Sequence, residues 1–273
     1  MRADPMTADG PGTDREPTEI DTSTPHSARI WNYWLGGTDN FPADRAAGDE
    51  VLARIPDIAE GARAQRAFLV RAVRFLVAEA GIRQFLDIGA GLPTLDNTHE
   101  VAQALAPECR VVYVDHDPLV LLHARALLTS TPEGATEYVE ADLQEPQRIL
   151  AEASRVLDFD RPVGLMLLGV VNHIMDSDRA GSAVRCLLDA VVPGSYLALT
   201  HSTAEIHGEP MLEVMRELNK RGGTPIRSRT RQEIVDLFRG TELLDPGVVS
   251  CSRWRPVWAN APDVYLFGGV GRR

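Results

Sequence analysis

The sequence predicts an α/β fold in which a mostly parallel sheet has helices on both faces. From Gln84 onward, short apolar runs alternate with longer segments of helical periodicity. Parallel strands need crossover connections, usually helical, and these crossovers are right-handed in nearly all proteins. The chain has 273 residues, of which 44% are hydrophobic and 25% charged, which is typical of a soluble globular protein able to bury a sizeable core.

The first part of the chain predicts a tail and then a short helix. Residues 1–25 are rich in Thr, Asp, Pro and Gly, so we expect a disordered tail. Residues 28–35 carry two Trp and one Tyr, which need a surface to pack on. The Gly36-Gly37 pair that follows is typical of a helix C-cap.

Two more helices are expected before the sheet, at residues 43–54 and 58–79. In the second of these, Leu69, Val73, Leu76 and Ala80 share one helical face, and Gly81 ends the pattern. We therefore expect residues 26–82 to form a helical cap or lid and residues 83–273 to form the sheet domain.

The alternating part predicts the parallel sheet itself. Each apolar run is bounded by turn residues, and each connecting segment is long enough for a helix. The expected strands are residues 85–88, 110–114, 137–140, 163–169 and 195–200, and the expected helices are residues 97–106, 118–128, 146–157 and 179–191.

The end of the chain has a different pattern. Residues 209–221 and 231–238 have helical periodicity, whereas residues 248–253 and 264–267 resemble two strands with no helix between them. Neighbouring strands of this kind favour an antiparallel pairing. We therefore expect seven strands, the last two forming a C-terminal antiparallel hairpin.

The charge balance disfavours a nucleic-acid partner. Lys and Arg number 28 against 39 Asp and Glu, a formal net charge of −11, so the chain has no global attraction for a phosphate backbone. The basic residues that could still form a local patch are Arg63, Arg66, Arg71 and Arg74. We interpret this run as a solvated helix face.

The three cysteines predict neither a metal site nor a disulfide framework. Cys109, Cys186 and Cys251 are far apart and odd in number, which fits a reducing cytoplasm. No apolar run approaches the ~18 residues of a membrane span. The N-terminus lacks the basic and apolar regions of a secretory signal.

The first strand of the series leads into a glycine turn, Gly89-Ala90-Gly91. Glycines at this place let the backbone turn sharply and approach a ligand closely. A dinucleotide fingerprint would have a third glycine, but Thr94 stands there. By itself the turn fits either an adenosine-containing ligand or a tight turn without a ligand.

Acidic residues follow the next two strands. Asp115 ends the second strand, where a carboxylate can accept both hydroxyls of a ribose. Asp142 follows the third strand and could accept from an adenine amino group, with Leu143 against the ring. Either acid alone could instead cap a helix. All three features meet at the carboxyl edge of the sheet, where open α/β folds bind ligands.

Several stretches resemble class I S-adenosylmethionine-dependent methyltransferases, a Rossmann-like fold. Residues 85–91, 112–118 and 140–143 are similar to the first three motifs of that superfamily. More narrowly, the chain resembles the actinobacterial "S-adenosyl methyltransferase" family, once catalogued as a domain of unknown function. The matching stretches are HSARIWNYWLGGTDNF (26–41), residues 66–75, QFLDIGAGLPT (84–94), VVYVDHDP (111–118), residues 141–146, PGSYLALTH (193–201) and residues 254–256.

The resemblance implies S-adenosylmethionine as the cofactor and gives each motif a role. The glycine turn, with Asp87 before it and Leu92 after it, is placed at the methionine end of the cofactor. Nucleic-acid amino-methyltransferases carry an Asn/Asp-Pro-Pro-aromatic motif after the fourth strand, and its absence argues against base methylation. The remaining implied roles are Asp115 at the ribose, His116 beside the adenine, Asp142 and Leu143 at the adenine, and Gly169 and Val170 beside the methyl group.

Two further hypotheses concern catalysis and closure of the site. Methyl transfer to a hydroxyl or amine needs a group that removes a proton, and His173 is the best candidate by position, ahead of His201 and His207. We also expect the aromatic N-terminal segment to close over the cofactor, with Tyr33 and Asn40 facing it.

We therefore expect a methyltransferase that acts on a small molecule by direct transfer, secondary metabolism being one source of such acceptors. The first alternative is a non-catalytic module that senses S-adenosylmethionine or its demethylated product. The second is an NAD-dependent oxidoreductase, against which the missing third glycine argues.

Overall fold

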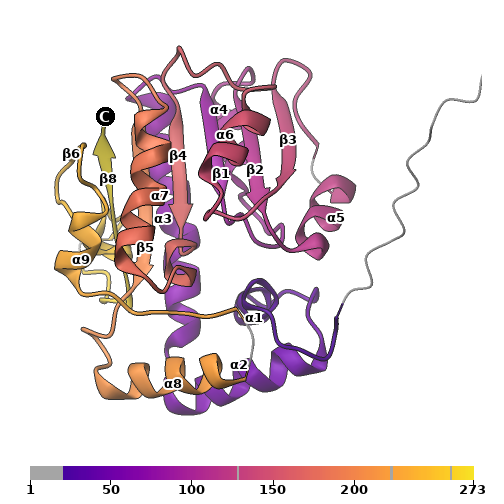
Figure 1. The fold of residues 1–273 in the computed structure, drawn as a ribbon, viewed down its shortest axis with the longest axis vertical. Helices are drawn as coiled ribbons and strands as arrows, with labels where there is room; N and C mark the ends of the chain where they lie inside the picture. Colours follow the sequence, from indigo (N-terminus) through magenta and orange to yellow (C-terminus); the bar gives the residue numbers. More distant parts are fainter. Residues whose placement is uncertain (1–20, 128, 222–223, 259) are drawn as a thin grey trace, which may run out of the picture.

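The chain forms a three-layered α/β structure with an added group of helices at one edge of the sheet (Figure 1). This computed structural model describes residues 21–127, 129–221, 224–258 and 260–273, so most of the expected tail at residues 1–25 lies outside the described residues. The strands are β1 Gln84–Ile88, β2 Arg110–Asp115, β3 Ala135–Glu140, β4 Gly164–Leu168, β5 Tyr196–Ser202, β6 Glu242–Leu243, β7 Val249–Ser250 and β8 Leu266–Arg272.

The sheet runs in the order β3-β2-β1-β4-β5-β8-β6, with β7 paired to β8. Strands β1 to β5 pair parallel with one another, and β8 lies antiparallel to β5, β6 and β7. The helices are α1 Ser27–Trp34, α2 Pro42–Arg54, α3 Ile58–Ala78, α4 Thr98–Leu105, α5 Pro118–Leu127, α6 Pro146–Ala153, α7 Ser177–Asp189, α8 Glu209–Lys220 and α9 Arg231–Asp236, with short 3₁₀ helices at Val171–His173 and Cys251–Arg253.

The sequences of the parallel strands are continuous apolar runs because helices cover both faces of the sheet. Successive side chains point to opposite faces. Phe85 and Met166 therefore belong to the core under α3 and α4, whereas Leu86 and Leu165 belong to the core under α6, α7 and α9. All five residues of β1 and of β4 are buried. The mostly parallel α/β class expected from the sequence is confirmed.

The C-terminal part differs from the expected hairpin. Val249 and Ser250 do pair antiparallel with Gly268 and Phe267, but β8 continues to Arg272 and pairs along β5 as well. The full length of β8 was not predicted because its sequence is rich in glycine. The glycines are needed there because a Cβ at Gly268 would come within 2.5 Å of the Leu199 carbonyl oxygen. With β6, only two residues long, the sheet has eight strands rather than seven among the described residues.

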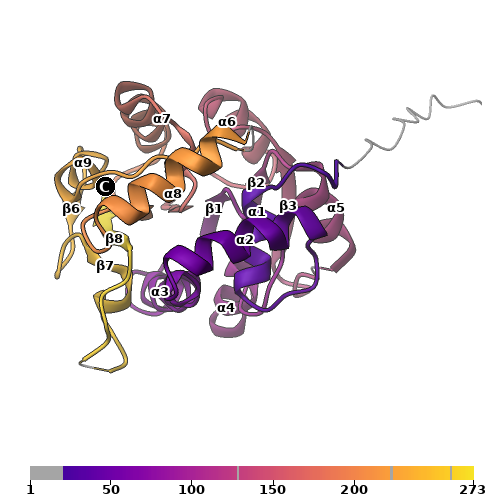
Figure 2. The same ribbon diagram turned by 90° about the horizontal axis from the view of Figure 1, so that it is seen from below.

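Helices α1, α2 and α8 lie across the carboxyl edge of the sheet (Figure 2). Helix α2 contacts both α1 and α8, and Arg221, just after α8, forms an ion pair with Glu50 of α2. Helix α3 extends from this group onto the sheet, where Phe68 and Leu76 are fully buried. Helix α8, from the far end of the chain, thus lies with α1 and α2 at this edge, although it falls outside the residues 26–82 that the sequence predicted as a cap.

None of the helices in the described ranges is long and apolar enough to cross a membrane.

Candidate functional site

The glycine turn after β1 is held in place by backbone hydrogen bonds to β2 and by packing against the segment after β4. Gly89 and Gly91 have φ of +75° and +67°, the left-handed region that favours glycine. The Gly89 N–H donates to the Val114 carbonyl at 2.8 Å, and a Cβ on Gly89 would overlap Val170. The turn therefore packs directly on the segment that follows β4.

Asp115, at the end of β2, fixes the far side of the turn. Its Oδ2 accepts from the Gly91 N–H at 2.9 Å, and its Oδ1 accepts from the Asp117 N–H at 3.0 Å. The residue is only 7% exposed. One carboxylate thus ties the β1 turn to the β2 turn at the carboxyl edge of the sheet.

Two connected cavities open at this edge. We call the first, of about 530 Å³, the polar chamber, because Asp115, Asp117 and Asp142 line it. We call the second, of about 210 Å³, the apolar chamber. It is lined by the glycine turn and by Trp31, Met211 and Met215 of helices α1 and α8. Residues that line both chambers are Pro25, His26, Gly89, Asp115, His116, Val170, His173 and Thr224.

Most of the residues selected from the sequence line these chambers. The acids, the glycine turn and the segment after β4 come together as expected from parallel strands that end at one edge. Asp87, Ala90, Gly91, Leu92 and Gly169 line the apolar chamber, Asp142 and Leu143 line the polar chamber, and Gly89, Asp115, His116, Val170 and His173 line both.

Tyr33 and Asn40 do not line either chamber, contrary to the orientation expected for the lid. The Tyr33 hydroxyl donates to Asp49 at 2.6 Å on the outer side of the helices. Asn40 Nδ2 donates to Asn32 Oδ1 and to the Gly37 carbonyl, both at 2.9 Å. Asn40 therefore braces the turn between α1 and α2. The N-terminal residues that do line a chamber include His26 and Trp31, which the sequence did not single out as ligand-facing.

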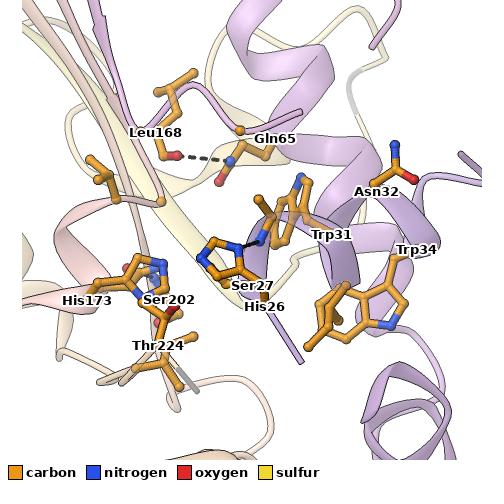
Figure 3. A pocket seen from close by; sticks show the side chains of 18 of the residues that line it. His26, Ser27, Trp31, Asn32, Trp34, Gln65, Leu168, His173, Ser202 and Thr224 are labelled. Carbon is orange, nitrogen blue, oxygen red and sulfur yellow. Dashed lines mark hydrogen bonds between the residues drawn. The ribbon is translucent and has the colours of Figure 1, made fainter. Parts of the chain in front are cut away.

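His173 is the one candidate base, of the three named from the sequence, that lines the chambers (Figure 3). Its Nδ1 lies 2.8 Å from the Pro225 carbonyl oxygen. Because a carbonyl only accepts, Nδ1 carries the proton and Nε2 keeps its lone pair in the neutral ring. Burial lowers the pKa of His173 below its ordinary value, although the bond to Pro225 opposes this shift. The imidazole is therefore neutral at pH 7.

His201 and His207 have structural partners instead. His201 is fully buried, and its Nε2 lies 2.6 Å from Nη1 of Arg229. Burial lowers its pKa to about 3, so it stays neutral. His207 Nε2 lies 3.4 Å from Asp57, and it lines neither chamber.

The arginine run on α3 is only partly a solvated face. Arg63 and Arg74 are exposed, as expected. Arg71 donates to the carbonyls of Trp254 and Cys251, and Arg66 lines the apolar chamber beside the glycine turn. Arg66 and Arg71 were expected on a solvated face, and this expectation was wrong. Helix α3 buries more of its surface than its charged residues suggest.

Arg66 is the functional candidate that the sequence reading missed. Its Nη2 donates to the carbonyls of Leu95 and Asp96 at 2.9 and 2.8 Å, and its buried Nε has no partner among the described residues. Asp87, the nearest acid, is buried, which raises its pKa to about 6. Arg66 stands three residues before Leu69 on the apolar face of the helix, and this spacing was the available signal.

Within the described ranges, no group of three or more His, Cys, Asp or Glu side chains is arranged to hold a metal ion. The cysteines Cys109, Cys186 and Cys251 are all free.

Comparison with known proteins points to one family. A family model described as "S-adenosyl methyltransferase" matches residues 13–273. A DUF574 family protein of Streptomyces avermitilis is 46% identical with a TM-score of 0.90, over 93% of this chain and 100% of that one. A candidate methyltransferase of Thermobifida fusca is 41% identical with a TM-score of 0.85, over 96% and 99%.

A more distant structure shows the fold alone. The SAM-dependent methyltransferase of Anabaena variabilis is 13% identical with a TM-score of 0.53, over 94% of this chain and 98% of that one. No curated protein matches the sequence. The family and the class I methyltransferase fold expected from the sequence are confirmed.

Proposed function

Because the chain belongs to the S-adenosyl methyltransferase family, and is therefore an enzyme that uses S-adenosylmethionine, we propose that it methylates a small molecule by direct transfer. The observation that carries the proposal is the pair of adjoining chambers, with shared lining residues, at the carboxyl edge of the sheet. One chamber has the carboxylates that an adenosine needs, and the other has room for an acceptor beside the glycine turn.

The polar chamber suits the adenosine part of the cofactor. Asp115 at the end of β2 and Asp142 after β3 both line it. In our proposal Asp115 accepts from the ribose hydroxyls, and Asp142 and Leu143 hold the adenine, with His116 beside it. This is the arrangement that ligands adopt at the carboxyl ends of parallel strands.

The glycine turn and Arg66 suit the methionine part. The orphaned, buried Nε of Arg66 is a donor that lacks a partner in the described residues, and such a group is costly unless a ligand satisfies it. An arginine matches the fork of a carboxylate. We assign Arg66 to the carboxylate of the cofactor and Asp87 to its ammonium group.

His173 is the proposed general base. When bound, S-adenosylmethionine supplies the methyl group, whose carbon forms a bond to the acceptor as the electron pair of the carbon–sulfur bond passes to sulfur. Nε2 of His173 accepts the proton that a hydroxyl or amine acceptor loses. The Pro225 carbonyl keeps the ring in the tautomer that this role requires.

The proposal also covers the class of the methyl acceptor and the cellular location of the protein. A formal net charge of −11 and the missing amino-methyltransferase motif argue against a nucleic-acid acceptor. The free cysteines support a location in a reducing cytoplasm.

Separate titrations with S-adenosylmethionine, S-adenosylhomocysteine and NAD test the proposal. We expect both sulfur compounds to bind and to raise the melting temperature, with no effect of NAD. Binding of NAD alone would overturn it. Binding of both sulfur compounds without S-adenosylhomocysteine release in the presence of any member of a small-molecule acceptor library would favour a sensor over an enzyme.

A further inference from the structure

The part of the apolar chamber away from the glycine turn is almost wholly apolar. Its side chains come from α1, α2, α3, α8, the loop after α8 and the segment at the start of β8, and most of them are buried. These walls are built by Trp31, Val51, Ile58, Leu69, Met211, Val214, Met215, Leu218, Ile226, Tyr265 and Leu266.

Three of the polar side chains that line this chamber are already bonded within the protein. Gln65 donates to the Leu168 carbonyl at 3.3 Å (Figure 3). It also accepts from the Thr200 hydroxyl at 2.8 Å. Asn32 Oδ1 accepts from Asn40. The Ser202 hydroxyl donates to the Arg227 carbonyl at 3.2 Å. These bonds leave the chamber few groups that could solvate a charged acceptor.

The basic residues of the chamber are engaged or reserved for the cofactor. Arg221 pairs with Glu50. Arg66 donates from Nη2 to two carbonyls next to the glycine turn, and its remaining buried donor, Nε, is the one that we assign to the carboxylate of the cofactor. A charge moved from water into such a space without a partner would cost several kcal/mol or more. The chamber therefore selects against ionised groups on the body of the acceptor.

One nitrogen atom without a hydrogen-bond partner marks the place where the nucleophilic group of the methyl acceptor would lie. His173 lines both chambers, and its Nε2 has no hydrogen-bond partner among the described residues. It faces the chamber across from Trp31 and Trp34, with His26 between them (Figure 3). A hydroxyl or amine beside this nitrogen would stand at the junction of the two chambers.

The volume limits the size of the molecule. An engineered cavity of about 150 Å³ with aliphatic and aromatic walls binds benzene. The apolar chamber has about 210 Å³, part of which the proposed cofactor site uses. The space fits one ring with a short apolar substituent.

We infer that the methyl acceptor is an uncharged, largely apolar small molecule, such as a substituted phenol or aryl amine, whose single nucleophilic atom lies at Nε2 of His173 and whose apolar body lies against Trp31, Val214 and Met215. The inference rests on the proposed function, since the chamber takes an acceptor only if the cofactor lies beside it.

A matched pair of probes tests the inference by calorimetry on protein saturated with S-adenosylhomocysteine. The probes are 4-propylphenol and 3-(4-hydroxyphenyl)propanoate, which share the ring and hydroxyl but differ in the charge at the far end. We expect 4-propylphenol to bind at least tenfold more tightly. Equal binding, tighter binding of the carboxylate, or no binding of 4-propylphenol would overturn the inference and leave the cofactor site intact.

Variants locate the bound probe. Met215→Glu should weaken 4-propylphenol at least tenfold, whereas Met175→Glu, the same change at a methionine that is 45% exposed, should not. Val214→Phe, which adds volume without charge, covers the case in which Met215→Glu does not fold. S-adenosylhomocysteine should bind all three variants within twofold of the parent. If it does not bind the parent protein, the proposed function itself is wrong.

Discussion

The two chambers share His26, Asp115 and His173, but different parts of the chain build them. Three acids of the polar chamber, Asp115, Asp117 and Asp142, stand at the end of β2 or in the short turns after β2 and β3. The helical walls of the apolar chamber come from α1, α2 and α3, which follow one another in the sequence, and from α8, which is far from them. The cofactor half of the site is therefore a property of local motifs, and the acceptor half is a property of tertiary assembly.

The largest effect is expected from a variant that removes the proposed general base and leaves cofactor binding intact. His173→Gln should lower the rate of S-adenosylhomocysteine release, measured with 4-propylphenol, by about 10²–10⁴-fold, the usual contribution of a general base. Cofactor affinity measured by calorimetry should stay the same. His207→Gln is the matched control, because His207 lies outside both chambers. An unchanged rate in His173→Gln would remove the base from the mechanism.

The pH profile of the same reaction tests the protonation state of this residue. The reaction needs neutral imidazole, and burial lowers the pKa of His173 below its ordinary value of 6.5. The rate at subsaturating 4-propylphenol should therefore stay level from pH 7.5 down to 6.5 and fall about tenfold per unit at lower pH. A fall that begins above pH 7 would contradict this assignment.

Asp115→Ala tests the polar chamber. The substitution removes the acceptor of two backbone N–H groups and of the proposed ribose hydroxyls. We expect S-adenosylmethionine affinity to drop by about 1–3 kcal/mol, measured by calorimetry. Asp160→Ala is the comparison, because Asp160 is exposed and precedes β4, at the opposite end of the strands from the chambers. Full affinity in Asp115→Ala would exclude this carboxylate from the site.

Arg66→Ala tests the part of the apolar chamber that lies beside the glycine turn. We expect cofactor affinity to fall about tenfold, within the range for a lost hydrogen bond to a charged group. Arg63→Ala, on an exposed position of the same helix, should have no effect. Similar affinities for the two variants would show that Arg66 serves only the carbonyls of Leu95 and Asp96.

Tyr33→Phe should have the smallest effect. The hydroxyl of Tyr33 donates to Asp49 and lines neither chamber. Cofactor affinity should remain within twofold of the parent, because only a surface hydrogen bond is lost. A clear loss of affinity would mean that the N-terminal segment changes its arrangement when the cofactor binds.

The sequence predicts the polar chamber well for a physical reason. A strand, a glycine turn and an acid at the next strand end are local patterns, and parallel topology brings them to one edge. Gly89, Asp115 and Asp142 could therefore be selected as site residues from the sequence alone. The same locality explains why the helices and the five parallel strands were found nearly at their true limits.

The apolar chamber could not be predicted in the same way. Helix α8 shows an apolar face, but nothing in that face specifies α2 as its neighbour. Arg66 was misread because its charge was weighed above its place on the buried side of α3. The end of β8 was missed because Gly268, Gly269 and Gly271 have low strand propensity, although close packing requires some of them.

The pairing of α2 with α8 has a consequence for biosynthesis. Glu50 and Arg221 are 171 residues apart in sequence, so their contact closes a very long loop. The N-terminal helices leave the ribosome long before α8 has been made. Until then, the side chains of α1 and α2 that face the apolar chamber, such as Trp31 and Val51, lack the wall that α8 contributes and are open to chaperones or to association with other chains. The acceptor chamber is complete only when α8 and the start of β8 have emerged from the ribosome.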